Sequence, residues 1–230
     1  MKKPLLILIL SALFIVVTIS KTPALINLDD ESIKIAIKYG LDNRYSDTKT
    51  ILGPNWIEGE DGFILTVYSP FIQLATKARS QNVPGASDED IKLVKKRLGR
   101  QLNQITTRQE VRFIVQIVGS NPGVCKDYKA YVEEFKEPEE TEEDAEGKKE
   151  GKGFWIFKKR DSKPKKLKAD KEVIQNKADL DNYNPLMPYS CFNSYNFKFD
   201  AINKLDKFYF VLEGPKEKER RYLVEKNVIF

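Results

Sequence analysis

Hydrophobic and polar positions follow three successive patterns along the chain. Residues 5–19 are apolar throughout, apart from Ser11 and Thr18. Residues 27–109 mostly repeat apolar positions every three or four residues, and residues 111–230 mostly alternate apolar and polar positions. Apolar positions every three or four residues are typical of helices with one buried face, and alternating positions are typical of strands. The pattern therefore predicts an apolar N-terminal helix, a helical region and a β-rich region.

The apolar stretch Leu5–Ile19 follows Lys2 and Lys3 and ends next to Ser20. This layout is typical of an export signal or an N-terminal membrane anchor, with the lysines on the cytoplasmic side. A signal core has roughly 7–15 apolar residues and a spanning helix about 17–25, so length leaves both interpretations open. We assign residues 1–20 as a signal peptide or membrane anchor. The remainder is expected to be extracytoplasmic, either periplasmic, secreted or tethered to the cytoplasmic membrane.

Three helices are predicted between residues 21 and 110, each beginning at a capping side chain. Asp30 is expected to cap the first helix, and Gly40 to end it, because glycine suits the left-handed position after a helix. Ser69, followed by proline, begins the second helix, and Ser87 begins the third with a capping-box pattern. The predicted helices cover about 31–39, 69–80 and 87–105.

One strand is predicted within the helical region, and several follow it. The segment 43–62 is rich in glycine and polar residues and is expected to form a loop before the strand at 63–68. The later strands are separated by turns that contain glycine, proline or asparagine. They are expected at 111–118, 128–135, 153–157, 189–199, 207–212 and 221–230.

Segregated helices and strands predict the α+β class. The chain is divided into a helical region, 21–110, and an antiparallel, β-sandwich-like region, 111–230. Packing of the helices on one face or end of the sheet would make 27–230 a single composite domain.

The strand pattern is interrupted by an acid-rich run at 136–152. Such a run buries too little apolar surface to offset its ordering entropy, so a mobile loop is predicted. Its expected position is the tip of a hairpin between 128–135 and 153–157. The basic stretch Lys158–Lys171 would then lie against the acidic tip. The two charged segments form either a solvated surface or a docking site for an anionic polymer or lipid headgroup.

Histidine is absent from the chain. This removes the usual general base of serine and cysteine hydrolases and the commonest metal ligand. The formal net charge is only +5, with 32% charged residues, which does not indicate nucleic-acid binding. No cofactor-binding motif is present, so no cofactor or metal is predicted.

Carboxylates beside Trp56 are the only candidates for catalysis that the sequence suggests. Glu58, Glu60 and Asp61 follow this tryptophan within a few residues. Two carboxylates can hydrolyse a glycosidic bond without histidine, so a hydrolase acting on an envelope polymer is an alternative function. The same oxygen-rich loop could suggest calcium, but the acidic spacing of an EF-hand is missing.

Two cysteines are present, Cys125 and Cys191. In an exported chain they could form one disulfide, provided that their Cα atoms lie within about 7 Å. The alternative is a pair of separate buried thiols that pack as small hydrophobic side chains.

The favoured interpretation is an exported or membrane-tethered bacterial protein that acts as a non-enzymatic binding module. Its expected partner is an envelope protein or another surface component, reached either as a free protein or through a tether at Leu5–Ile19.

Overall fold

The computed structural model describes most of the chain beyond the N-terminal stretch. Within the described residues, helices occur together with antiparallel strands, which confirms the α+β class. The apolar stretch 5–19, most of the acid-rich run and the predicted strand at 153–157 lie outside these residues. The described residues are 28–59, 62–136, 164–180, 185–215 and 218–226.

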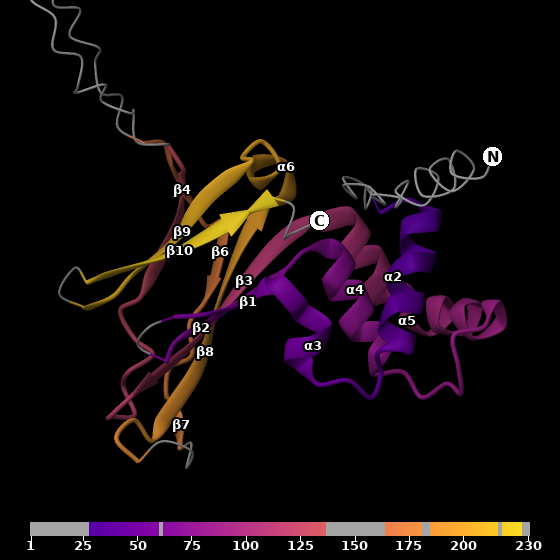
Figure 1. Ribbon diagram of the computed structural model, residues 1–230, viewed down its shortest axis with the longest axis horizontal. Coiled ribbons are helices and arrows are strands. Elements are labelled where there is room, and N and C mark those ends of the chain that lie inside the picture. Colours follow the sequence, from indigo (N-terminus) through magenta and orange to yellow (C-terminus); the bar gives the residue numbers. More distant parts are fainter. Residues whose placement is uncertain (1–27, 60–61, 137–163, 181–184, 216–217, 227–230) are drawn as a thin grey trace, which may run out of the picture. The chain divides into compact units, whose positions relative to one another are not determined.

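The described chain divides into two compact units, which are treated separately below (Figure 1). A helical unit contains residues 28–56 and 67–111, and a β-rich unit contains residues 57–66 and 112–226. Of the helices described, none is long and apolar enough to cross a membrane.

Four α-helices and one 3-10 turn make up the helical unit as described. Two of the predicted caps are present: the Ser69 hydroxyl accepts a hydrogen bond from Ile72 N at 3.3 Å, and Ser87 forms a capping box with Asp90. A short helix, a 3-10 turn and a short strand also occupy the segment that was expected to be a loop. The elements are α2 (Asp30–Asp42), α3 (Thr48–Leu52), η1 (Gly53–Asn55), α4 (Pro70–Arg79) and α5 (Asp88–Arg108).

The predicted ends of the first helix are wrong at both positions. Asp29, rather than Asp30, caps α2, because its carboxylate accepts from Ser32 N at 2.8 Å. Gly40 does not end the helix but lies inside it. A Cβ at this position would overlap the backbone oxygen of Ala75 in α4. Glycine is therefore needed here because two helix backbones come close together, and not because the helix stops.

The helical unit has its own apolar core. Three of its helices each contribute one face of aliphatic side chains, as the spacing of three to four residues predicts. The buried cluster contains Ile33, Ala36, Ile37, Leu41, Leu74, Ala78, Val83, Ile91, Val94 and Leu98.

The β-rich unit contains two sheets. The first has the order β1-β2-β3-β8-β6, with β7 also paired to β8, and the second has the order β10-β9-β4-β5. A short helix, α6 (Phe199–Ile202), follows β8. The first sheet contains β1 (Trp56–Glu58), β2 (Ile64–Tyr68), β3 (Glu110–Gly119), β6 (Lys171–Val173), β7 (Asp179–Leu180) and β8 (Tyr189–Lys198). The second contains β4 (Lys129–Glu134), β5 (Lys166–Lys168), β9 (Lys207–Glu213) and β10 (Glu219–Glu225).

The basic stretch after the acid-rich run contains short strands that the sequence pattern does not predict. Lys166–Lys168 forms a strand that pairs with β4, and Lys171–Val173 pairs with β8. These strands are only three residues long, so their positions depend on the register of their partners and leave little pattern in the sequence.

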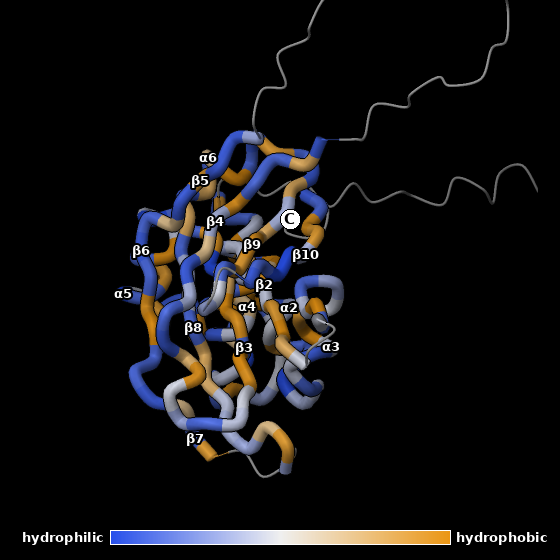
Figure 2. Tube along the Cα trace, turned by 90° about the vertical axis from the view of Figure 1, so that its left-hand side faces the viewer, coloured by the Kyte–Doolittle hydropathy of each residue, from blue (hydrophilic) through white to orange (hydrophobic). Residues whose placement is uncertain are grey.

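Aromatic side chains join the two sheets. The ring of Phe113 on β3 stacks on Phe210 of β9, with centroids 4.9 Å apart and planes 12° apart. Phe197 on β8 meets Phe113 edge-on at 5.3 Å. Apolar residues are frequent along β3, much of which is coloured as hydrophobic in Figure 2. Such offset and edge-to-face pairs stabilise by roughly 0.5–1.5 kcal/mol beyond the area that they bury.

The close approach at Gly40 is testable. Gly40→Ala should lower the free energy of unfolding by about 2 kcal/mol or more, because the added methyl group meets the α4 backbone rather than a flexible side chain. The matched control is Gly99→Ala in α5, where an added Cβ meets no atom within 4 Å. That change should raise stability by about 0.5–1 kcal/mol. Urea unfolding of both variants provides the measurement, and similar effects of the two changes would contradict the packing described.

Candidate functional site

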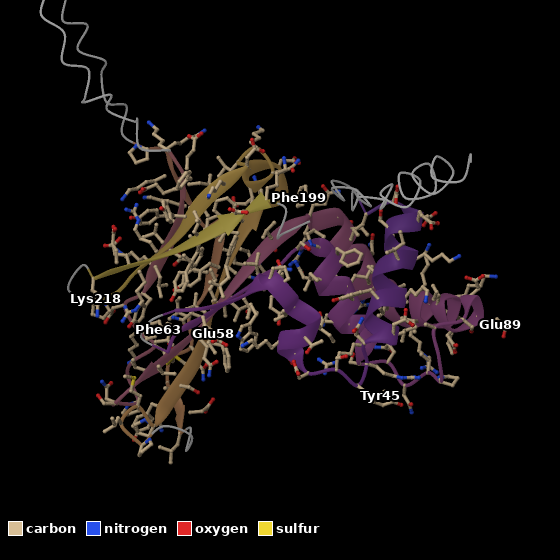
Figure 3. The ribbon with its side chains drawn as sticks, in the orientation of Figure 1. Tyr45, Glu58, Phe63, Glu89, Phe199 and Lys218 are labelled. Atoms are coloured by element: carbon tan, nitrogen blue, oxygen red, sulfur yellow. A yellow bond between two sulfur atoms is a disulfide. The ribbon has the colours of Figure 1, made fainter. Side chains whose placement is uncertain are left out.

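The acid cluster beside Trp56 lies at a hairpin turn. Glu58 is exposed at the end of β1 (Figure 3). The turn is closed by hydrogen bonds from Gly59 N to Phe63 O at 2.7 Å and from Gly62 N to Gly59 O at 3.2 Å. Glu60 and Asp61 lie outside the described residues. No group of three or more potential metal ligands occurs in the part of the chain that the structure describes.

Cys125 and Cys191 are joined by a disulfide, and their Cα atoms lie 6.0 Å apart. The buried Asn193, two residues along β8, donates from Nδ2 to Cys125 O at 3.0 Å. Its Oδ1 accepts from Gln175 N at 3.1 Å. One side chain therefore connects β8 with the turn before β4 and with the segment between β6 and β7.

Tyr195 lies two residues beyond Asn193 on β8, so its side chain faces the same side of the sheet. Its hydroxyl donates to Tyr128 O at 3.4 Å, and burial raises the pKa of this phenol. The row Cys191, Asn193, Tyr195 and Phe197 is almost inaccessible to solvent. Alternation along the strand then requires the intervening side chains to face the other side of the sheet.

Exposed apolar side chains collect beside this strand. Nine large hydrophobic residues are exposed in the described part of the chain, and five of them lie between positions 173 and 192. Val173 pairs with Ser194, so it projects from the same face as Phe192, which is 55% exposed. We define the β8 apolar surface as Val173 and Phe192 together with Leu186 and Met187, which precede the strand. Leu180 is not part of it, because it pairs with Tyr189 and projects from the opposite face of the sheet.

The edge of β8 next to this surface is closed by a side chain. Phe192 lies between the part of β8 that pairs with β6 and the part that pairs with β7. Its backbone N–H donates to Gln175 Oε1 at 3.0 Å. Gln175 thus takes the place of a neighbouring strand. The backbone N–H at this position is therefore satisfied within the unit.

The outer face of the second sheet carries polar and charged side chains that contact one another. Tyr131 OH donates to Glu219 Oε1 at 2.6 Å and accepts from Lys166 Nζ at 2.9 Å. Burial of the phenol, reinforced by Glu219, raises the pKa of Tyr131. Glu133, which is only 8% exposed, forms an ion pair with Arg221. The charged groups of this face are paired with one another, which suits a rigid scaffold rather than a vacant site.

The ion pair of Glu133 and Arg221 should be coupled more strongly than an exposed pair. We expect a double-mutant cycle with Glu133→Ala and Arg221→Ala to give a coupling of about 1–2 kcal/mol in the free energy of unfolding, since Glu133 is shielded from water. The control is Lys207 and Glu225 on the same sheet, 3.2 Å apart with both side chains accessible. Its cycle should give about 0.5 kcal/mol or less. Equal couplings would show that the shielding has no energetic effect.

The sequence pattern did not identify the β8 apolar surface. The segment 172–189 is polar overall and broken by prolines, so its few apolar residues carry no periodic signal. Val173 and Phe192 share a face because β6 pairs with β8. One sequence signal for this surface was Phe192, an apolar residue at a position where alternation along the strand predicts an exposed side chain.

No family model, curated protein or solved structure matches this chain.

Proposed function

We propose that this chain is an exported, non-enzymatic binding protein of the cell envelope that recognises a partner protein through the β8 apolar surface. The observation that carries the proposal is the presence of four of the nine exposed large hydrophobic residues of the described chain on or just before one strand, with Val173 and Phe192 on the same face. Contiguous apolar side chains on a protein surface mark interaction sites more often than isolated ones do.

The chemistry of the surface favours a protein over a lipid. The residues near it in the sequence carry charges of both signs: Lys171 and Lys177 are basic, and Glu172 and Asp179 are acidic. An anionic bilayer attracts clusters of basic residues and is repelled by acidic ones. A mixed polar rim around an apolar centre is instead typical of protein interfaces. Phe192 provides a rigid aromatic anchor and Met187 an adaptable one.

The scaffold suits this role. We describe the β-rich unit as sandwich-like, and the stacking of Phe113 on Phe210 between its two sheets supports this description. The disulfide and Asn193 hold β8 in register, so the surface would be presented without much reordering on binding. Such preorganisation reduces the entropic cost of association.

Two features support placement outside the cytoplasm. The lysine-flanked stretch Leu5–Ile19 has the composition of a signal peptide or anchor. A disulfide between Cys125 and Cys191 is stable in an oxidising compartment and rare in the cytosol. The alternative, hydrolysis by two carboxylates, needs a second acid roughly 5–9.5 Å from the first across a cleft. Only Glu58 of the proposed acids is among the described residues, and it is exposed on a hairpin.

Site-specific photocrosslinking in the cells that make the protein tests the proposal. A photoreactive phenylalanine analogue is placed at Phe192 or at Ser194, which pairs with Val173 and projects from the same face, in the full chain. Both positions should yield an adduct with the same partner protein, and Val173→Asp should abolish that adduct because it places a charge in the apolar contact. Control positions are Leu93, 40% exposed on α5, and Leu223, 41% exposed on β10. These should not yield the adduct.

Three outcomes would contradict the proposal. They are adducts with lipid only, adducts with a second copy of this chain only, and the same adducts from the control positions. The circular dichroism and melting temperature of the Val173→Asp variant should match those of the wild type, because Val173 is exposed on a short edge strand.

A further inference from the structure

We infer that the helical unit contains a second, separate binding site, which takes a sugar that carries a carboxylate or phosphate group. The site is a hollow of about 370 Å³ between the loop after α2 and the loop after α4. Its volume falls in the range of small-molecule pockets, roughly 300–1,000 Å³. Its lining consists of Arg44, Tyr45, Arg79, Ser80, Gln81, Asn82, Val83 and Pro84.

Two arginines are fixed in the hollow by backbone carbonyl groups. Arg44 donates to the carbonyl oxygens of Val83 and Pro84 through two different nitrogens. Arg79 donates to Ser46 O, from Nε to Arg44 O at 3.4 Å, and from Nη1 to the Thr48 hydroxyl at 3.5 Å. A guanidinium group has five N–H donors in a planar fork. The bonds to carbonyl groups therefore orient each fork and leave further donors for a ligand.

The positive charge of these arginines has no carboxylate partner within the hollow. None of its lining residues is acidic. Each ion pair that the structure describes joins other residues, so neither Arg44 nor Arg79 takes part in one within the described chain. Asp47 lies near Arg79, but its pKa is lowered mainly by the hydrogen bonds with Thr50, where it caps α3. Carbonyl dipoles orient a guanidinium without neutralising it, so an oxyanion would gain charge-assisted hydrogen bonds here.

Tyr45 indicates that the ligand is larger than a simple oxyanion. Its side chain is 90% exposed at the surface of the helical unit (Figure 3). The centroid of its ring lies 4.9 Å from the Arg44 guanidinium carbon, and Tyr45 is one of the residues that line the hollow. An aromatic face beside a cation offers a platform for the C–H face of a sugar ring while the cation binds its acidic group. Ser80, Gln81 and Asn82 supply polar groups within reach of sugar hydroxyls.

Calorimetric titration of the full chain at low salt tests the site with four probes. D-Glucuronate and glucose 6-phosphate should bind, whereas D-glucose, which lacks the acidic group, should not. Inorganic phosphate should bind about threefold or more weakly than glucose 6-phosphate, because it gains nothing from the aromatic ring. Arg44→Gln should weaken binding of both acidic sugars by about tenfold, the loss expected for one charge-assisted contact.

Tyr45→Ala separates ligand binding from a purely structural role of the arginines. Because Tyr45 is exposed, this variant should keep the wild-type melting temperature and lose about threefold in affinity for the acidic sugars. The matched charge control is Lys92→Gln, which removes a cation that does not line this hollow. Its affinities should equal those of the wild type.

Several results would overturn the inference. They are glucose binding as tightly as glucuronate, no binding of either acidic sugar, equal binding of phosphate and glucose 6-phosphate, and full affinity in the Tyr45→Ala variant. Val173→Asp, which disrupts the β8 apolar surface in the other unit, should leave sugar affinity unchanged. The two proposed sites can therefore fail independently.

Discussion

The disulfide between Cys125 and Cys191 is the constraint on which the β-rich unit depends. It ties β8 to the turn before β4, and the residues that follow along β8 continue the same connection. Asn193 bonds Cys125 O, Tyr195 bonds Tyr128 O, and Phe197 meets the aromatic contact between the sheets. Because side chains alternate across a strand, a slip of one residue would exchange this whole inward row for the outward one. The cross-link therefore specifies the register as well as restricting the unfolded chain.

The register of β8 also determines what the other face presents. With Cys191 and Asn193 directed inward, Phe192 is directed outward, and pairing with β6 brings Val173 to the same face. Gln175 meanwhile satisfies the backbone of Phe192. The proposed protein-binding surface and the buried polar contacts are thus two consequences of one strand position. The hollow at Arg44 and Arg79 is independent of it, because its contacts lie within the helical unit.

Local signals predicted much of the fold. Ser69 and Ser87 cap helices as expected, and the alternation from Val111 onward forms β3. Errors arose where a tertiary contact overrides a local preference. The local sequence predicts a helix end at Gly40. The residue instead lies within α2, where glycine is needed because the Ala75 backbone comes close. The sites were harder to predict. The apolar surface needs β6 in place beside β8, and Arg44 acquires its role through the carbonyl of Val83, 39 residues away. No periodicity encodes such contacts.

Mapping the cysteines of the protein isolated from its own cells tests this account most directly. The protein is unfolded in denaturant that contains an alkylating reagent and no reductant, then digested and analysed by mass spectrometry. We expect a linked pair of peptides containing Cys125 and Cys191 and no alkylation at either residue, because export exposes the chain to an oxidising compartment and the fold places the two Cα atoms 6.0 Å apart. Alkylation of both thiols would contradict the disulfide and the proposed compartment.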